Sequence, residues 1–139
     1  MNRRFLAFIL LAVVTAFMWS DTVIEWWQAT LDFFLRVNEG VTESVLETRP
    51  ENDVDLHVIV WAMTSMIFVW AFRNKWLLAL FALFLWSAFV ETLQPVFTEI
   101  RSRQLADYVG NGIGVAVTAL GAAVVFRLRR SSQPSSPER

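Results

Sequence analysis

The sequence predicts an all-α integral membrane protein, a bundle of four transmembrane helices with an additional extracytoplasmic helix at the membrane interface. Three observations favour this fold class. Of the 139 residues, 55% are hydrophobic and 12 are Phe, more large apolar side chains than so short a soluble domain can bury. Four apolar runs divide the chain, and most charged residues lie between or beside these runs.

The four apolar runs are each expected to form one membrane span. They comprise residues 5–19, 56–72, 76–97 and 105–126. At about 1.5 Å per residue, the last two can cross a hydrocarbon core of about 30 Å, whereas the first two require local thinning of the bilayer or flanking residues. The first run follows two arginines, as in a signal peptide, but no cleavage site follows it, so we expect an uncleaved anchor. Pro95 is expected to kink or end the third span.

Lysine and arginine residues predict the orientation, because cytoplasmic loops are enriched in both. In a four-span arrangement, one side carries Arg3, Arg4, Arg73, Lys75, Arg127, Arg129, Arg130 and Arg139. The opposite side carries fewer basic residues and nearly all of the acidic ones. We therefore expect a multi-pass protein of the cell membrane with both termini in the cytoplasm. A single domain of residues 1–126 would precede a disordered cytoplasmic tail of residues 127–139.

The long external segment, residues 21–55, has the pattern of a helix. Thr22 and Glu25 fit a capping box, and apolar residues recur at helical spacing from Trp27 onward. We expect this helix to lie on the outer interface with Trp26 and Trp27 at headgroup depth. The alternative is that the segment is the outer end of the first span, which simply bends.

Polar side chains within the spans are the strongest functional signal, because a charge near the membrane centre costs a few kcal/mol. Glu91 and Gln94 are three residues apart, and Asp107 and Asn111 are four apart, so each pair shares one helix face. His57 opens the second span. In the predicted orientation all of these groups lie in the outer half of the membrane, and we expect them to meet there.

Structural explanations also fit parts of this pattern. The side chains of His57 and Asp107 can reach interfacial water, and Arg101 can form an ion pair with a nearby carboxylate. Small residues at helical spacing in the fourth span indicate helix packing rather than a ligand site. They are Gly110, Gly114, Thr118 and Gly121.

The polar residues follow one another in a characteristic order. Glu-x-x-Gln is followed by Arg, Asp, Asn and Gly, which are here Glu91, Gln94, Arg101, Asp107, Asn111 and Gly114. An acidic residue also stands four positions before a His at the head of a span, as Asp53 and His57. This order resembles the signature of the VanZ-like family of small membrane proteins, most closely over residues 53–121, and the four-span layout agrees with it.

The family takes its name from a protein associated with low-level resistance to the glycopeptide antibiotic teicoplanin, and no accepted reaction goes with it. The resemblance therefore implies an envelope-associated membrane protein and a link to antibiotic resistance. It does not imply an enzyme.

The first functional hypothesis is a non-enzymatic module that binds an amphiphile or a lipid-linked envelope precursor. Its partners would be membrane lipids and a lipid-linked cell-wall precursor or glycopeptide antibiotic. Carboxylates and amides would hydrogen-bond a polar head group, while Arg101 would pair with a phosphate. The expected ligand-binding residues are Asp53, His57, Glu91, Gln94, Arg101, Asp107 and Asn111.

The second hypothesis is an enzyme acting on such a precursor, with His57 as general base and Glu91 or Asp107 as acid. No obvious nucleophile accompanies these candidate catalytic residues. One histidine and two carboxylates can ligate a metal, but a lone histidine favours a site without metal, and we expect no cofactor. Ion transport is disfavoured by the apolar inner halves of the spans, and no basic stripe indicates nucleic-acid binding.

Overall fold

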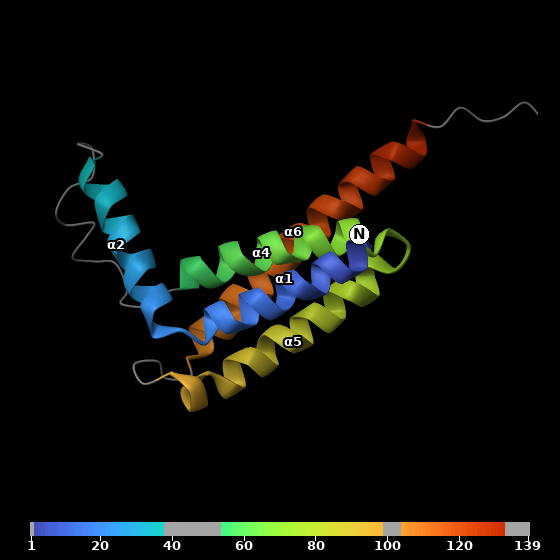
Figure 1. The fold of residues 1–139 in the computed structure, drawn as a ribbon. Coiled ribbons are helices and arrows are strands. Elements are labelled where there is room, and N and C mark those ends of the chain that lie inside the picture. Colours follow the sequence, from blue (N-terminus) through green and yellow to red (C-terminus); the bar gives the residue numbers. More distant parts are fainter. Residues whose placement is uncertain (1, 38–53, 99–103, 133–139) are drawn as a thin grey trace, which may run out of the picture.

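The computed structural model describes residues 2–37, 54–98 and 104–132, and every regular element within these ranges is a helix (Figure 1). Helices α1, α4, α5 and α6 run side by side, whereas α2 leaves the bundle at one end (Figure 1). The elements are α1 (Arg3–Met18), α2 (Asp21–Val37), α4 (Val54–Ala71), the short 3₁₀ helix η1 (Arg73–Lys75), α5 (Trp76–Phe97) and α6 (Leu105–Ser131).

Three segments of the described chain are long and apolar enough to cross a membrane: Val54–Ala71, Arg73–Phe97 and Leu105–Ser131. These three helices indicate a membrane protein, as the sequence predicts. A fourth span arises only if α1 and the start of α2 count as one, and these two segments are bent by 86°.

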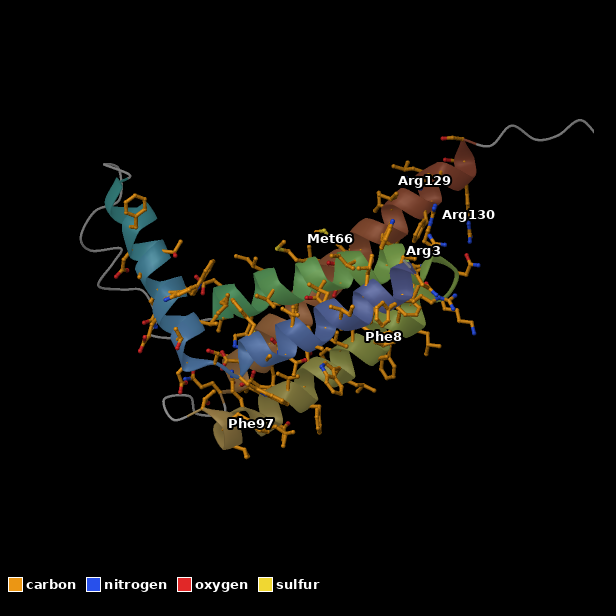
Figure 2. All side chains as sticks on the ribbon, viewed as in Figure 1. Arg3, Phe8, Met66, Phe97, Arg129 and Arg130 are labelled. Carbon is orange, nitrogen blue, oxygen red and sulfur yellow. The ribbon has the colours of Figure 1, made fainter. Side chains whose placement is uncertain are left out.

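The outward-facing surface of the bundle is apolar. Phe8, Met66 and Phe97 each leave more than half of their surface exposed (Figure 2). Similar large apolar side chains are exposed along α4, α5 and α6. A soluble monomer rarely exposes so much contiguous apolar surface, so contact with lipid chains explains this face.

The interior contains both small and large apolar side chains. Ala7 of α1 and Trp61 of α4 are fully buried, and Leu83 and Val90 of α5 pack in the same cluster. The indole nitrogen of Trp86 donates to the Thr15 hydroxyl over 3.0 Å and so joins α5 to α1. The bundle is therefore a packed core rather than an open channel over these residues.

Glycine allows α4 and α6 to approach closely. A Cβ atom on Gly114 would lie 2.5 Å from the carbonyl oxygen of Val58, and one on Gly110 would lie 3.0 Å from that of Val54. One turn after Gly114, the Thr118 hydroxyl donates across the helix pair to the Ala62 carbonyl over 3.1 Å. The helix-packing prediction is thus confirmed for this part of the small-residue stripe.

Two predicted details are wrong. Helix α2 begins at Asp21, so Thr22 lies within its first turn and is not the residue that caps it. Helix α6 continues to Ser131, so residues 127–131 are helical, not part of a disordered tail. Arg and Leu are strong helix formers, and cations near a helix C-terminus interact favourably with its dipole, which explains the extension.

The remaining predictions fall at helix ends or beyond the described residues. Pro95 lies in the last turn of α5, which ends at Phe97. Most of the external segment after α2, residues 38–53, lies outside the described residues, as does the tail after residue 132.

Candidate functional site

Four of the predicted site residues come together at one end of the bundle. His57 lies in the first turn of α4, Glu91 lies near the end of α5, and Asp107 and Asn111 lie in the first two turns of α6. Because α5 runs antiparallel to α4 and α6, these positions are at one level (Figure 1). None of the four residues is more than 3% exposed.

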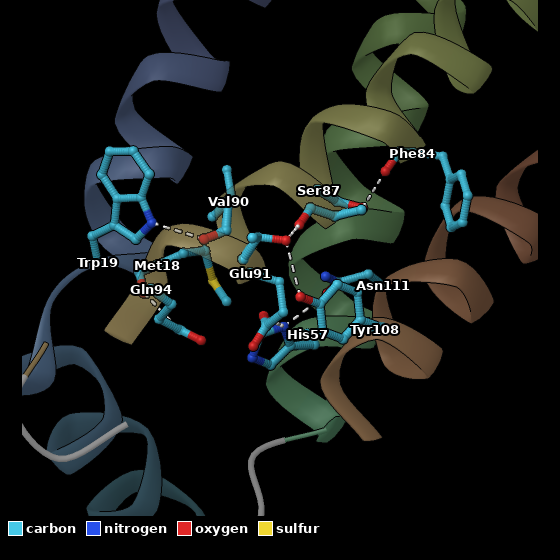
Figure 3. A network of polar contacts seen from close by, with 12 residues as sticks. Met18, Trp19, His57, Phe84, Ser87, Val90, Glu91, Gln94, Tyr108 and Asn111 are labelled. Atoms are coloured by element: carbon cyan, nitrogen blue, oxygen red, sulfur yellow. Dashed lines mark hydrogen bonds and ion pairs between the residues drawn. The ribbon is translucent and has the colours of Figure 1, made fainter. Parts of the chain in front are cut away.

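The His57 ring links the three helices (Figure 3). Its Nδ1 atom lies 2.7 Å from Asn111 Oδ1 and 3.7 Å from Glu91 Oε2. An amide oxygen only accepts hydrogen bonds, so this contact is a hydrogen bond in the tautomer that carries its hydrogen on Nδ1. In the neutral ring the lone pair is then on Nε2, where it can accept a proton or bind a metal.

Asp107 completes a group of potential metal ligands. One nitrogen of His57 and one carboxylate oxygen each from Glu91 and Asp107 lie within 4.8 Å of one another. Ligands of a tetrahedral zinc ion, each about 2.0–2.2 Å from the metal, lie about 3.5 Å apart, which is well below this limit. These three side chains would therefore have to move closer together to hold a divalent cation.

Short contacts between helices fix the backbone around this cluster. A Cβ atom on Gly110 would lie 3.2 Å from the Cβ of His57, so glycine is what brings α6 against this histidine. The hydroxyl groups of Thr92 and Tyr108 are 3.0 Å apart and join α5 to α6 at the exposed surface beside the cluster. The positions of Glu91 and Asn111 are thereby set relative to His57.

Gln94 lies one turn beyond Glu91 and connects α5 to α1. Its Nε2 donates to the Met18 carbonyl over 2.9 Å (Figure 3). The neighbouring Trp19 donates from its indole nitrogen to the Val90 carbonyl over 3.1 Å, and its ring stacks on Phe97. The amide nitrogen of Gln94 therefore holds the end of α1. Its Oε1 atom is buried without a hydrogen-bond partner among the described residues.

Helix α2 adjoins the same end of the bundle. The Trp27 indole nitrogen donates to Asp55 Oδ1 over 3.3 Å, and a cavity of about 180 Å³ lies between α2, the end of α1 and the start of α4. Its lining includes Trp26, Trp27 and Leu56, the last of which directly precedes His57. The side chains of the cluster itself do not line this cavity.

Two expected site residues, Asp53 and Arg101, lie outside the described residues. The structure therefore does not place them relative to His57. The ion pair expected between Arg101 and a carboxylate stays a prediction.

The sequence reasoning missed three fully buried residues, the core residue Trp61 and the polar residues Ser65 and Ser87. Trp61 and Ser65 follow His57 at intervals of four residues, a spacing that could have identified them as one face of α4. Ser65 lies about 12 Å along the helix axis from His57, too far to act as a nucleophile activated by this base. The Ser87 hydroxyl donates to the Phe84 carbonyl over 2.8 Å, a bond within α5.

Comparisons with known protein families, with characterised proteins and with solved structures give no match. The similarity to the VanZ-like signature therefore depends on the residues quoted above.

Proposed function

We propose that the chain is a VanZ-like integral membrane protein that binds the polar head of an amphiphilic or lipid-linked envelope ligand in the outer half of the membrane. One observation carries this proposal: His57, Glu91, Asp107 and Asn111 converge, fully buried, from three helices whose outer surfaces are apolar. Burying such groups in a membrane is expensive, and intramembrane ionisable residues commonly mark a functional site. Binding a cell-wall precursor there would alter its display or the access of a glycopeptide such as teicoplanin.

The chemistry of the cluster favours a head group rich in hydroxyls. Carboxylates only accept hydrogen bonds when ionised, and charge-assisted bonds from sugar hydroxyls to them are strong. The Asn111 Nδ2 and Gln94 Oε1 atoms, both buried without a hydrogen-bond partner among the described residues, would supply one donor and one acceptor. Arg101 would pair with a phosphate of the same ligand.

The proposed topology has four spans, with α1 as the first, and both termini in the cytoplasm. Helix α2 would lie on the outer interface, where the amphipathic ring of Trp26, which is 72% exposed, would sit among the headgroups. This arrangement puts the polar cluster outside and the arginine-rich end inside.

Cysteine accessibility tests this topology, because the chain has no native cysteine. Gln28 of α2 and Asn74 of η1 are both exposed and lie at opposite ends of the bundle. In intact cells, a membrane-impermeant maleimide is expected to label the Gln28→Cys variant and to label the Asn74→Cys variant only after permeabilisation. The reverse pattern would place the cluster on the cytoplasmic side.

Photo-crosslinking tests the binding function. A photoactivatable lipid-linked cell-wall precursor is expected to label α5 and α6 of the full chain in membranes. Since hydrogen bonds to charged groups contribute about 1.5–3 kcal/mol, labelling should fall about tenfold or more in Glu91→Gln or Asp107→Asn. The control is Val96→Ala, which alters a side chain of α5 that is 74% exposed. Labelling that avoids α5 and α6, or that is equal in all variants, would refute the proposal.

A membrane enzyme acting on the same precursor is the second candidate, favoured by the position of His57 beside the carboxylates of Glu91 and Asp107. With Nδ1 donating to Asn111, the lone pair on Nε2 is suited to a general base, and Glu91 or Asp107 would be the acid. A His57→Gln variant separates the two functions. If it binds the precursor but leaves it chemically unchanged where the wild type converts it, the site is catalytic.

A further inference from the structure

Helices α4 and α6 separate toward the arginine-rich end. Gly114 and Gly121 both belong to the small-residue stripe of α6, but only Gly114 contacts α4 closely. A Cβ atom on Gly114 would meet the α4 backbone at 2.5 Å, whereas one on Gly121 would meet nothing within 4 Å. Between the two helices beyond this point is a groove of about 580 Å³. This volume lies within the range of about 300–1,000 Å³ typical of ligand pockets.

The groove is apolar along its length and basic at its end. Met66, Val69 and Trp70 line it from α4, and Val117, Gly121 and Val125 line it from α6. At the basic end it reaches Arg73 and Arg129.

Arg73, Phe126 and Arg129 also line an adjoining cavity of about 470 Å³, so the groove leads directly into it. Arg3 and Arg130 contribute further positive charge to this cavity, and their side chains lie at the same end of the bundle as Arg129 (Figure 2). Of the described residues that line the groove or the cavity, none is acidic. The groove and the cavity together form one surface, which is apolar along the groove and ends at four arginines: Arg3, Arg73, Arg129 and Arg130.

The depth of this surface matches the layers of a bilayer. Helix α6 has 27 residues. At about 1.5 Å per residue it extends about 40 Å, beyond a hydrocarbon core of about 30 Å. With the start of α6 at one edge of the hydrocarbon core, its last turns would lie at the level of the lipid phosphates. The groove before them lies at the level of the acyl chains.

We propose that this surface binds one anionic phospholipid of the leaflet at the arginine-rich end. An acyl chain occupies the groove between α4 and α6, and the phosphate and anionic head group contact the arginines of the adjoining cavity. A second copy of the chain is a poorer occupant, because two-fold pairing through this face brings the arginines of both copies together. The inference is independent of the outer polar cluster.

Native mass spectrometry of the purified full chain tests the head-group contact. The probes are phosphatidylglycerol and phosphatidylcholine with identical acyl chains. Each arginine near a lipid head group contributes about fivefold in affinity, so the Arg73→Gln/Arg129→Gln double variant should bind phosphatidylglycerol about 25-fold more weakly. The control is Arg127→Gln, which removes an exposed charge from α6 that lines neither cavity and should leave binding unchanged. Equal affinity for the two lipids, or an equal loss in the control, would overturn the proposal.

A second pair of variants tests the groove itself. Gly121→Leu fills the groove from an open position, whereas Ala123→Leu adds bulk at an exposed residue that lines neither cavity. Phosphatidylglycerol binding should fall at least tenfold in Gly121→Leu and persist in Ala123→Leu. Unchanged binding in Gly121→Leu would exclude the groove as the acyl site. A dimer that Gly121→Leu dissociates, with no change in lipid binding, would show that a second copy covers this face instead.

Discussion

Replacing Gly114 with valine is expected to destabilise the packing of α4 against α6 strongly. Even the first added atom, Cβ, would lie 2.5 Å from the Val58 carbonyl oxygen and 2.9 Å from the Ala62 backbone nitrogen. Both contacts are backbone atoms of α4, so no side-chain rotation relieves them. Overpacking of this kind costs about 1–3 kcal/mol, and we expect Gly114→Val to reach or exceed the upper value.

The matched control is Gly121→Val on the same stripe of α6, where a Cβ atom has open space around it. Because glycine in a helix interior is about 0.5–1 kcal/mol less stable than alanine, this substitution should be neutral or slightly stabilising. Thermal unfolding of both variants in the same detergent measures the difference. Equal melting temperatures would mean that α4 and α6 do not cross at Gly114.

The second large effect is expected at the hydrogen bond between His57 and Asn111. In Asn111→Leu, the acceptor 2.7 Å from His57 Nδ1 is lost, and Glu91 Oε2 at 3.7 Å is too far to replace it without movement. Removing one partner of a buried hydrogen bond costs about 1–3 kcal/mol. Replacing both partners by apolar groups of similar shape is nearly neutral, so the double variant His57→Phe/Asn111→Leu should recover much of the lost stability.

The same two variants separate stability from function. Thermal unfolding should rank the wild type and the double variant close together, with Asn111→Leu below both. Crosslinking to the lipid-linked precursor should be lost in both variants, because each has lost the amide of Asn111. Recovery of crosslinking together with stability would show that His57 and Asn111 only hold the helices together.

Much of the architecture follows from hydropathy, since membrane-crossing length and apolar composition are local properties of the sequence. The third run was predicted over the residues that form α5, and the fourth starts where α6 starts. The end of α6 was not predicted, because the arginine-rich sequence resembles a solvated tail until helix propensity is weighed. The first run forms α1, which has 16 residues and reaches the length of a span only together with the start of α2, into which the chain bends sharply.

The level of the polar cluster was also predictable, because alternating helices put the start of one and the end of the next at the same side. The hydrogen bonds made by the polar residues were not predictable from the sequence. Gln94 shares the Glu91 face in sequence, yet its amide nitrogen binds the Met18 carbonyl of α1, a contact between residues far apart in the chain. Gly114 and Gly121 look alike in sequence, but only the crossing angle of α4 and α6 decides which one is packed.

The central claim is that His57 of α4 lies against the start of α6, where Asp107 and Asn111 complete the site. Disulfide formation tests it directly, since a Cβ on Gly110 would lie 3.2 Å from the His57 Cβ, close to the separation of about 3.5–4.5 Å in disulfides. In the cysteine-free chain, we predict that oxidation protects both thiols of His57→Cys/Gly110→Cys from maleimide labelling of the protein denatured afterwards. The control pair His57→Cys/Gly112→Cys, in which residue 112 faces Phe84 of α5, should remain reactive. A reactive 57/110 pair together with a protected 57/112 pair would contradict the proposed site.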